Sequence, residues 1–216
     1  MPTDLPDHGR PELSAAAHSE WDGHVEGVLR GIAHALNNRA AALSAVIELS
    51  RDPEEDSAVS AILGTELERV GGLAAAVQSM VSGKDGPDAF DPGDVVPEAQ
   101  AILRLHAELR DRRVTIVASG APPLRMPRWM FVRTLVVLGA NAARAVQDAK
   151  VVMAAEGDWL VTLAEVGDAT ALSTGITPYL NELAHAMGGE PLLTKRGFGF
   201  RVPTLAALRR REGREG

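Results

Sequence analysis

The sequence predicts an α + α/β protein, in which an N-terminal helical hairpin dimerises into a four-helix bundle and is followed by an α/β domain. Three observations predict this fold class. Apolar residues recur at helical spacing in two long segments between about residues 14 and 82. A stretch rich in glycine, proline and aspartate, residues 83–94, interrupts that pattern. Helix-like and strand-like segments then alternate toward the C-terminus, as they do in α/β domains.

The first long helix is predicted from about residue 14 to residue 50. Two series of apolar residues recur there at multiples of seven positions, offset by three or four residues: Val25, Ile32 and Val46, and Leu29, Leu36 and Leu43. This spacing is typical of a helix packed in a bundle or coiled coil. RDPEED (51–56) favours a turn, and a second amphipathic helix is expected over 57–82. One such hairpin leaves an apolar stripe uncovered, so we expect two copies to form a four-helix bundle.

Composition and pattern divide the chain into five segments. We expect a disordered leader at 1–12, the hairpin at 13–83, a linker at 84–94, the α/β domain at 95–205 and a polar tail at 206–216. Within the α/β domain the pattern predicts helices near 95–112, 128–147 and 176–188. It predicts strands near 114–119, 149–155 and 159–166, before a final hairpin.

Composition also excludes several classes of function. The net charge of −7 argues against non-specific binding to nucleic acid or anionic membrane. The chain has no cysteine, which excludes disulfides and zinc–thiolate sites and fits a reducing cytoplasm. The most apolar segment, 129–146, contains Arg133 and Arg144 and is too short and too charged to span a bilayer. We therefore expect a soluble, cytoplasmic protein without a nucleic-acid or membrane partner.

His34 lies in the middle of the first helix, away from its apolar face. Because a helix turns 100° per residue, a position two residues from Ile32 and from Leu36 points away from the bundle. Arg30 lies one turn before His34, and Asn38 one turn after it. A neutral imidazole is a nitrogen nucleophile near pH 7, and a guanidinium attracts phosphate. His34, Asn38 and Arg30 are therefore the candidate catalytic residues; the alternative is an ordinary solvated histidine.

Two glycines, Gly27 and Gly31, lie on the same side of the helix as His34. Each costs about 1 kcal/mol relative to alanine, so their presence predicts that another group approaches the helix backbone closely. No metal site is predicted. Four further histidines lack metal-ligand spacing and are interpreted as ordinary residues: His18, His24, His106 and His185.

Five motifs resemble those of two-component sensor histidine kinases. IAHALNNRAAAL (32–43) is similar to the H-box, whose histidine carries the phosphoryl group within a dimeric four-helix bundle. The other four, in order, resemble the second bundle helix, the entry to the ATP-binding domain, the N-box, and the closing helix with its Gly-Gly turn and last hairpin. Their sequences are ELERVGGLAAAV (66–77), FDPGDVVPEAQAIL (90–103), LVVLGANAARAV (135–146) and AHAMGGEPLLTKRGFGFRVP (184–203). The resemblance implies a phosphoacceptor role for His34 and a reduced histidine-kinase-type (Bergerat-like) α/β sandwich.

The ATP-binding motifs depart from the family's pattern. Asn141 matches the asparagine that holds magnesium in the family, but Val137 replaces the earlier asparagine of that motif. Glu165 and Gly167 fall where the family's Asp-x-Gly-x-Gly recognises adenine, with glutamate for aspartate and without the second glycine. DATALSTG (168–175) leaves no room for the family's lid and second glycine-rich box. The resemblance names Asn141, Glu165 and Gly167 as vestigial binding residues, with ATP and magnesium bound only if this degenerate pocket still works.

The residues next to His34 also depart from the pattern of a working kinase. Ala35 replaces the acidic residue that assists phosphorylation by ATP in the family, whereas Asn38 matches a position linked to dephosphorylation of receivers. This combination resembles the dimeric kinase-like histidine phosphotransferases of phosphorelays. The resemblance implies two partners, a response-regulator receiver domain and a second copy of this chain. Two alternatives remain open. One is a compact ATP-dependent histidine kinase or receiver phosphatase, and the other is a non-catalytic dimeric scaffold that binds a receiver.

Overall fold

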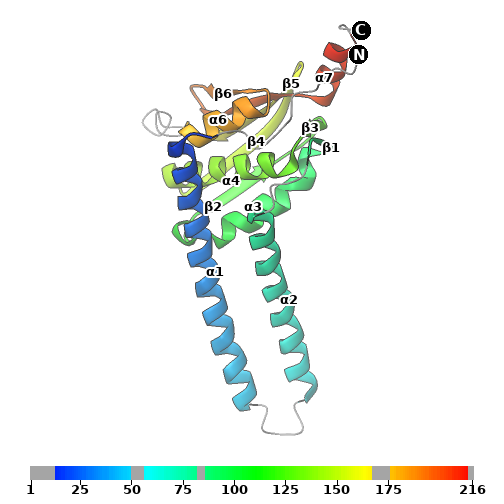
Figure 1. The fold of residues 1–216 in the computed structure, drawn as a ribbon. Coiled ribbons are helices and arrows are strands. Elements are labelled where there is room, and N and C mark those ends of the chain that lie inside the picture. Colours follow the sequence, from blue (N-terminus) through cyan, green and yellow to red (C-terminus); the bar gives the residue numbers. More distant parts are fainter. Residues whose placement is uncertain (1–12, 50–55, 82–85, 167–175, 214–216) are drawn as a thin grey trace.

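The computed structural model describes residues 13–49, 56–81, 86–166 and 176–213. A hairpin of two long helices projects from an α/β domain (Figure 1). Helix α1 spans Ala15–Leu49 and helix α2 spans Asp56–Val81. The predicted order of a helical hairpin followed by an α/β domain is thus confirmed. The predicted leader and most of the predicted turn at 51–56 lie outside the described residues.

The α/β domain is built on a five-stranded mixed sheet with the order β2–β4–β5–β7–β6. The strands are β2 (Arg113–Val117), β4 (Asp148–Glu156), β5 (Trp159–Glu165), β6 (Glu190–Leu193) and β7 (Gly197–Pro203). Strands β2 and β4 run parallel, and the other neighbours run antiparallel. A parallel pair requires a crossover connection, which contains helix α4 (Arg128–Ala145).

Three helices, α3 (Val96–Leu105), α4 and α6 (Pro178–Ala186), lie against one face of this sheet (Figure 1). Strand β4 illustrates this arrangement. Ala149, Val151 and Met153 are buried, whereas Lys150 is exposed and Val152 is half-buried. This period of two is typical of a sheet with one covered face. Helix α4 lies at the centre of the layer, so it is apolar on nearly all sides.

Two segments differ from the predicted linker and first helix of the α/β domain. Part of the predicted linker forms strand β1 (Asp88–Phe90), which pairs with β3 (Leu124–Met126), and the 3-10 helix η1 (Pro92–Val95). The predicted helix at 95–112 is broken at His106, which is extended with φ −69° and ψ 118°. A short 3-10 helix, η2 (Ala107–Leu109), follows and turns the chain into β2. The break matters because it forms the corner that contacts α1.

The predicted polar tail also contains a helix, α7 (Leu205–Glu212). The Thr204 side chain caps its N-terminus by accepting a hydrogen bond from the Ala207 amide at 3.2 Å. Ala207 is buried against the rest of the domain. The sequence analysis did not predict this helix. Only Ala207 in it is buried and the rest is rich in arginine, so it has no apolar period that would indicate a packed face.

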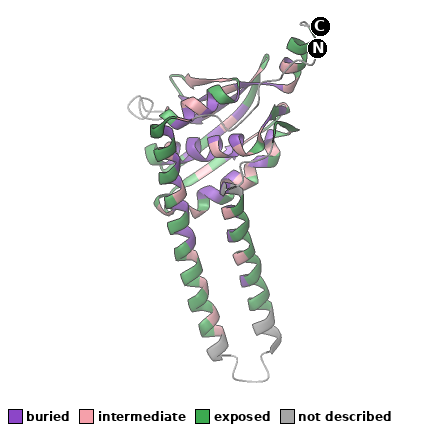
Figure 2. Ribbon diagram, in the orientation of Figure 1, coloured by how far each residue is buried: buried purple, intermediate pink, exposed green. Residues whose placement is uncertain are grey.

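The base of the hairpin shares one hydrophobic core with the α/β domain. The shared cluster includes buried residues of both long helices: Ala17, Trp21, Val28, Ile32, Leu73, Ala76 and Met80. Figure 2 shows these buried positions where the hairpin meets the domain, while exposed residues dominate the part that projects away from it. Among the described helices, none is both long and apolar enough to cross a membrane.

Candidate functional site

His34 lies just beyond the part of α1 that packs on the α/β domain, and its side chain is exposed. Asn38, also exposed, follows one turn later, and its Nδ2 lies 3.1 Å from His34 Nε2. With the amide nitrogen as donor, Nε2 accepts and the ring proton resides on Nδ1. That tautomer places the reactive lone pair on the outer nitrogen of the ring. The structure therefore brings together two of the three candidate catalytic residues.

Arg30, the third candidate, is bound to another partner. Its Nη2 lies 2.6 Å from Oε1 of Glu26, and both side chains are exposed. An exposed pair of this spacing contributes about 0.3–0.5 kcal/mol. A doubly charged phosphoryl group at His34 can therefore compete for the guanidinium, and a phosphate-binding role for Arg30 stays a prediction.

Gly27 and Gly31 face the α/β domain and not an incoming substrate. A Cβ at position 27 would lie 2.5 Å from Cε1 of His106, and a Cβ at position 31 would overlap the carbonyl oxygen of Leu105. The prediction of a close approach is correct, but the approaching group is the corner between α3 and η2 of the same chain. Because Gly31 lies one turn before His34 on the same side of α1, this corner borders the candidate site.

An ion pair holds the corner to helix α4. Arg144 Nη2 lies 3.1 Å from Oε2 of Glu108 in η2. The hydrogen bond from Arg144 holds the pKa of the Glu108 carboxyl below its usual value, so this side chain stays charged at neutral pH. The corner thus presents a fixed pair of opposite charges at the edge of the site.

The candidate nucleotide residues have other partners. The Oδ1 atom of Asn141, the atom that would bind a magnesium ion, accepts a hydrogen bond from Arg144 at 3.0 Å. Glu165 is exposed at the end of β5, 3.8 Å from the Lys150 ammonium. It lines an open hollow of about 600 Å³ whose residues do not include Asn141: Val146, Asp148, Glu165, Val166, Lys195 and Arg196. Gly167 lies outside the described residues. Among the described candidates, the side chains of Asn141 and Glu165 thus contact Arg144 and Lys150, and the loss of ATP and magnesium binding stays a prediction.

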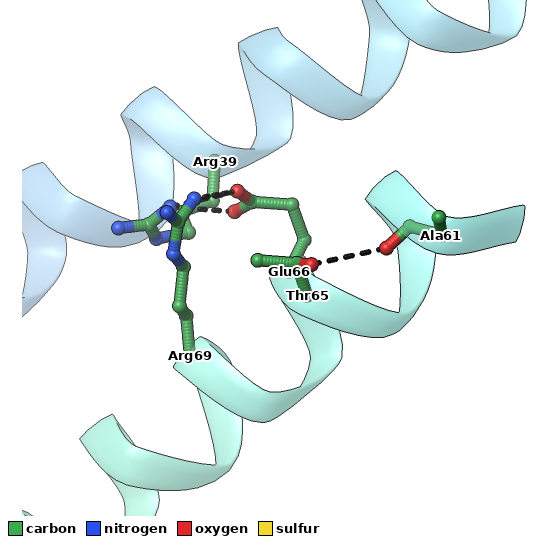
Figure 3. A network of polar contacts seen from close by, with 5 residues as sticks. All are labelled: Arg39, Ala61, Thr65, Glu66 and Arg69. Carbon is green, nitrogen blue, oxygen red and sulfur yellow. Dashed lines mark hydrogen bonds and ion pairs between the residues drawn. The ribbon is translucent and has the colours of Figure 1, made fainter. Parts of the chain in front are cut away.

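A charged cluster next to Asn38 was missed by the sequence analysis. Arg39 Nη1 donates to both carboxylate oxygens of Glu66, at 2.9 and 2.7 Å, and Arg69 bonds to the same carboxylate (Figure 3). Glu66 is only 6% exposed, and the hydrogen bond from Arg39 is the main cause that lowers the pKa of its carboxyl. Arg39 occupies the missing member of the seven-residue series that contains Ile32 and Val46, which was the available signal. A polar pair on such a seam fixes the pairing of helices.

This chain is similar to known proteins in its structure. No protein-family profile matches the sequence, and no curated protein sequence matches it. The structure is similar to that of the histidine kinase AdeS from Acinetobacter baumannii, with 14% identity and a TM-score of 0.45 over 80% of this chain and 98% of that chain.

Two other solved structures show a similar degree of likeness. Full-length ShkA in complex with AMPPNP has 14% identity and a TM-score of 0.44, and the match covers 80% of this chain and 45% of that chain. The catalytic domain of the histidine kinase ThkA has 13% identity and a TM-score of 0.42, with 56% of this chain and 98% of that domain covered. AdeS and ThkA belong to the class of protein that the five sequence motifs resemble. The likeness is distant, and the residues of this chain carry the function proposed below.

Proposed function

We propose that the protein is a histidine phosphotransferase of a two-component phosphorelay, which exchanges a phosphoryl group between His34 and receiver-domain aspartates without ATP-dependent kinase activity of its own. One observation carries the proposal. The exposed His34 has its Nε2 beside Asn38 on α1, immediately beyond the point where the same helix is packed into the α/β domain. The nucleophile is therefore presented outward, while the domain that would have to deliver ATP is held against the helix.

Polar contacts at the start of α1 support a fixed attachment of this domain. The Ser14 amide donates to the Glu182 carboxylate of α6 at 2.7 Å, and the Ser14 hydroxyl does so at 2.5 Å. In return, the Tyr179 amide of α6 donates to Glu20 of α1 at 3.0 Å. Each helix thus supplies a carboxylate to the first turn of the other, where free amides need acceptors.

Aromatic contacts support the same conclusion. The Trp21 ring of α1 stacks on Tyr179 of α6 with centroids 5.5 Å apart. The Arg133 guanidinium of α4 lies 4.7 Å from the centroids of both Trp21 and Trp129. Moving the α/β domain away from α1 would expose these rings together with Val28 and Ile32. Exposing each large apolar side chain costs about 1.5–3 kcal/mol, so a swing of the domain toward His34 is unfavourable.

The transfer step uses atoms of His34 and the receiver alone. The Nε2 lone pair of His34 attacks the phosphorus of the receiver's aspartyl phosphate and forms a P–N bond. The P–O bond to the aspartate breaks, and the carboxylate leaves with the electron pair; the reverse reaction loads the next receiver. Asn38 must first release Nε2, after which its amide can donate to a phosphoryl oxygen. Arg30 can leave Glu26 to neutralise part of the added charge.

The proposed partners are a receiver domain and a second copy of this chain. Five large apolar side chains of the projecting hairpin are between 36% and 72% exposed: Leu29, Leu36, Ile62, Leu63 and Leu67. A stripe of this kind on paired helices indicates a further helix–helix interface. A dimer would cover the stripe and leave His34, on another side of α1, open to a receiver.

The test compares His34→Gln with His18→Gln, a matched change at an exposed histidine of the same helix. Each protein is incubated with a panel of receiver domains carrying labelled aspartyl phosphate, and separately with γ-labelled ATP and magnesium. We expect acid-labile label from receivers on the wild type and on His18→Gln, none on His34→Gln, and none from ATP on any protein.

Three other outcomes would contradict the proposal. Label from ATP that depends on His34 would identify a compact histidine kinase. Faster loss of receiver phosphate without labelled protein, abolished in Asn38→Ala, would identify a phosphatase. Receiver binding that His34→Gln leaves intact, with no transfer by any variant, would identify a scaffold.

A further inference from the structure

Two histidines are buried together in the joint between α1 and the corner of α3 and η2. His24 is 1% exposed and His106 is fully buried, and their rings lie edge to face with centroids 5.6 Å apart. Neither ring nitrogen of His106, nor Nδ1 of His24, has a hydrogen-bond partner among the described residues. Buried polar groups in proteins are normally paired. Both rings are therefore buried at this joint without the partners that such groups normally have.

The described residues around the joint carry more positive than negative charge. The His106 ring fills the space that a side chain at position 27 would take, so Gly27 contacts the imidazole directly. Three charged groups face the two rings from the surrounding elements: Arg30 from α1, Glu108 from η2 and Arg144 from α4. Two of these are cations, and the single carboxylate already pairs with Arg144. A proton on either imidazole would place a buried positive charge close to these two arginines, whose own side chains reach solvent.

We propose that the two histidines form an acid-sensitive latch, which holds the α3–η2 corner on α1 while both rings are neutral and releases it when they are protonated. The latch goes beyond the proposed phosphotransfer, because it concerns the contact of the α3–η2 corner with α1 and not the chemistry of His34. The contacts of Ser14, Glu20 and Trp21 with α6 are not part of it.

The direction of the pH effect follows from the pKa values of the docked and released forms. Burial, and then the charge of Arg144, lower the pKa of His24 to about 3 in the docked joint. Burial and Arg144 lower the pKa of His106 as well. In the released joint both rings return to a pKa of about 6.5. The released form therefore binds more protons below pH 6.5, so docking is strongest above that pH and weakens as the pH falls from 6.5 toward 3.

The size of the effect is set by proton linkage. Each histidine changes the ratio of released to docked molecules by up to about tenfold per pH unit between its docked and its released pKa, and both together by up to about a hundredfold where these ranges overlap. In a single histidine variant, the logarithm of the ratio of released to docked molecules should therefore change about half as steeply with pH as in the wild type.

The test measures a distance across the joint in the full chain. The sequence contains no cysteine, so Asp22→Cys on α1 and Ala101→Cys on α3, both exposed, provide two sites for spin labels. Double electron–electron resonance between pH 8 and 4.5 should show one docked distance at pH 7.5 and a growing longer-distance population below pH 6.5. His24→Phe with His106→Phe keeps aromatic rings without titration, and should remain docked. His185→Phe, the same change at an exposed histidine of α6, should respond as the wild type does.

A wild type that keeps one distance down to pH 4.5 would overturn the latch, as would a double variant that opens at the same pH. If the double variant does not fold, the single variants and the wild-type histidines still test the latch. Nitrogen chemical shifts of His24 and His106 should report neutral imidazoles in the docked protein at pH 5.5. Protonated rings in a docked joint at that pH would exclude the proposed mechanism, whatever the function of His34.

Discussion

The two halves of helix α1 belong to one continuous helix but have different surroundings. In residues 15–32 one face of the helix is covered by the same chain: Trp21, Val28 and Ile32 are buried in the α/β core, whereas Leu29 is 48% exposed. Beyond them, Leu36 is 41% exposed, and no side chain of residues 33–46 is buried. The seven-residue repeat runs through both halves. A repeat of this kind thus predicts that a helix face will be covered, but it does not tell which surface covers it.

The contact that separates the two halves is the approach of the α3 end to Gly31, and breaking it should give the largest effect. In Gly31→Ala the new Cβ overlaps the Leu105 carbonyl oxygen, which belongs to the backbone and cannot rotate away. We expect the free energy of unfolding to fall by about 3 kcal/mol, the upper range for overpacking. Urea denaturation followed by circular dichroism measures the change.

Gly23 provides the matched control on the same helix, because a Cβ at that position meets nothing within 4 Å. Gly23→Ala should raise the free energy of unfolding by up to about 1 kcal/mol through helix propensity alone. Equal effects of the two substitutions would mean that the α3 corner does not rest on α1.

The Arg133 contacts join the docked half of α1 to α2 and should give an intermediate effect. Arg133 lies between Trp21 and Trp129, and its Nη2 donates to the Met80 carbonyl at the end of α2 at 2.7 Å. Arg133→Met keeps an unbranched apolar stem but removes the cation–π contacts and this hydrogen bond. We expect a loss of about 2 kcal/mol from these terms combined.

The control is Arg128→Met on the same helix, where an exposed arginine pairs with Glu98 at 3.2 Å. An exposed pair contributes at most about 1 kcal/mol, so the control should change stability by less than half as much. If both variants lose the same free energy, Arg133 does not act as a clamp between the helices.

Sequence patterns predicted the regular elements of this fold well, because apolar periodicity reports which face of an element is buried. The strand predicted near 149–155 and the helix predicted near 128–147 both correspond to observed elements, β4 and α4. The break at His106 was not predicted, because Leu103, Leu105 and Leu109 continue an apolar pattern across it. Tertiary contact with α1 favours the break over a longer helix, and such a contact has no local signal.

Parts of the site were also predictable. The exposed position of His34 and its spacing from Asn38 follow from helix geometry, and the structure places their side chains in contact. The surroundings of Gly27 and Gly31 were not predictable, because a glycine in a helix signals a close approach without naming the approaching group. Likewise, His24 and His106 are 82 residues apart in the sequence, and only the folded joint brings their rings together.

The open half of the hairpin should give the smallest effect on the protomer and a separate effect on association. Leu67 on α2 is 72% exposed, so Leu67→Gln removes almost no contact within one chain. The free energy of unfolding of the protomer should change by less than about 0.5 kcal/mol. In a dimer with twofold symmetry the substitution occurs twice, and burial of each leucine contributes about 1.5–3 kcal/mol. We therefore expect the dissociation constant to rise about a hundredfold or more.

Sedimentation equilibrium of Leu67→Gln measures this constant, with Glu68→Gln as the control at the neighbouring exposed position. The two variants together test whether Leu67 is buried against a second copy or is exposed to water. A dissociation constant that changes only in Leu67→Gln would show that the stripe on α2 is the dimer interface. If both variants associate like the wild type, the apolar side chains of the open half do not face a second copy. The receiver would then be the remaining proposed partner for this half of the hairpin.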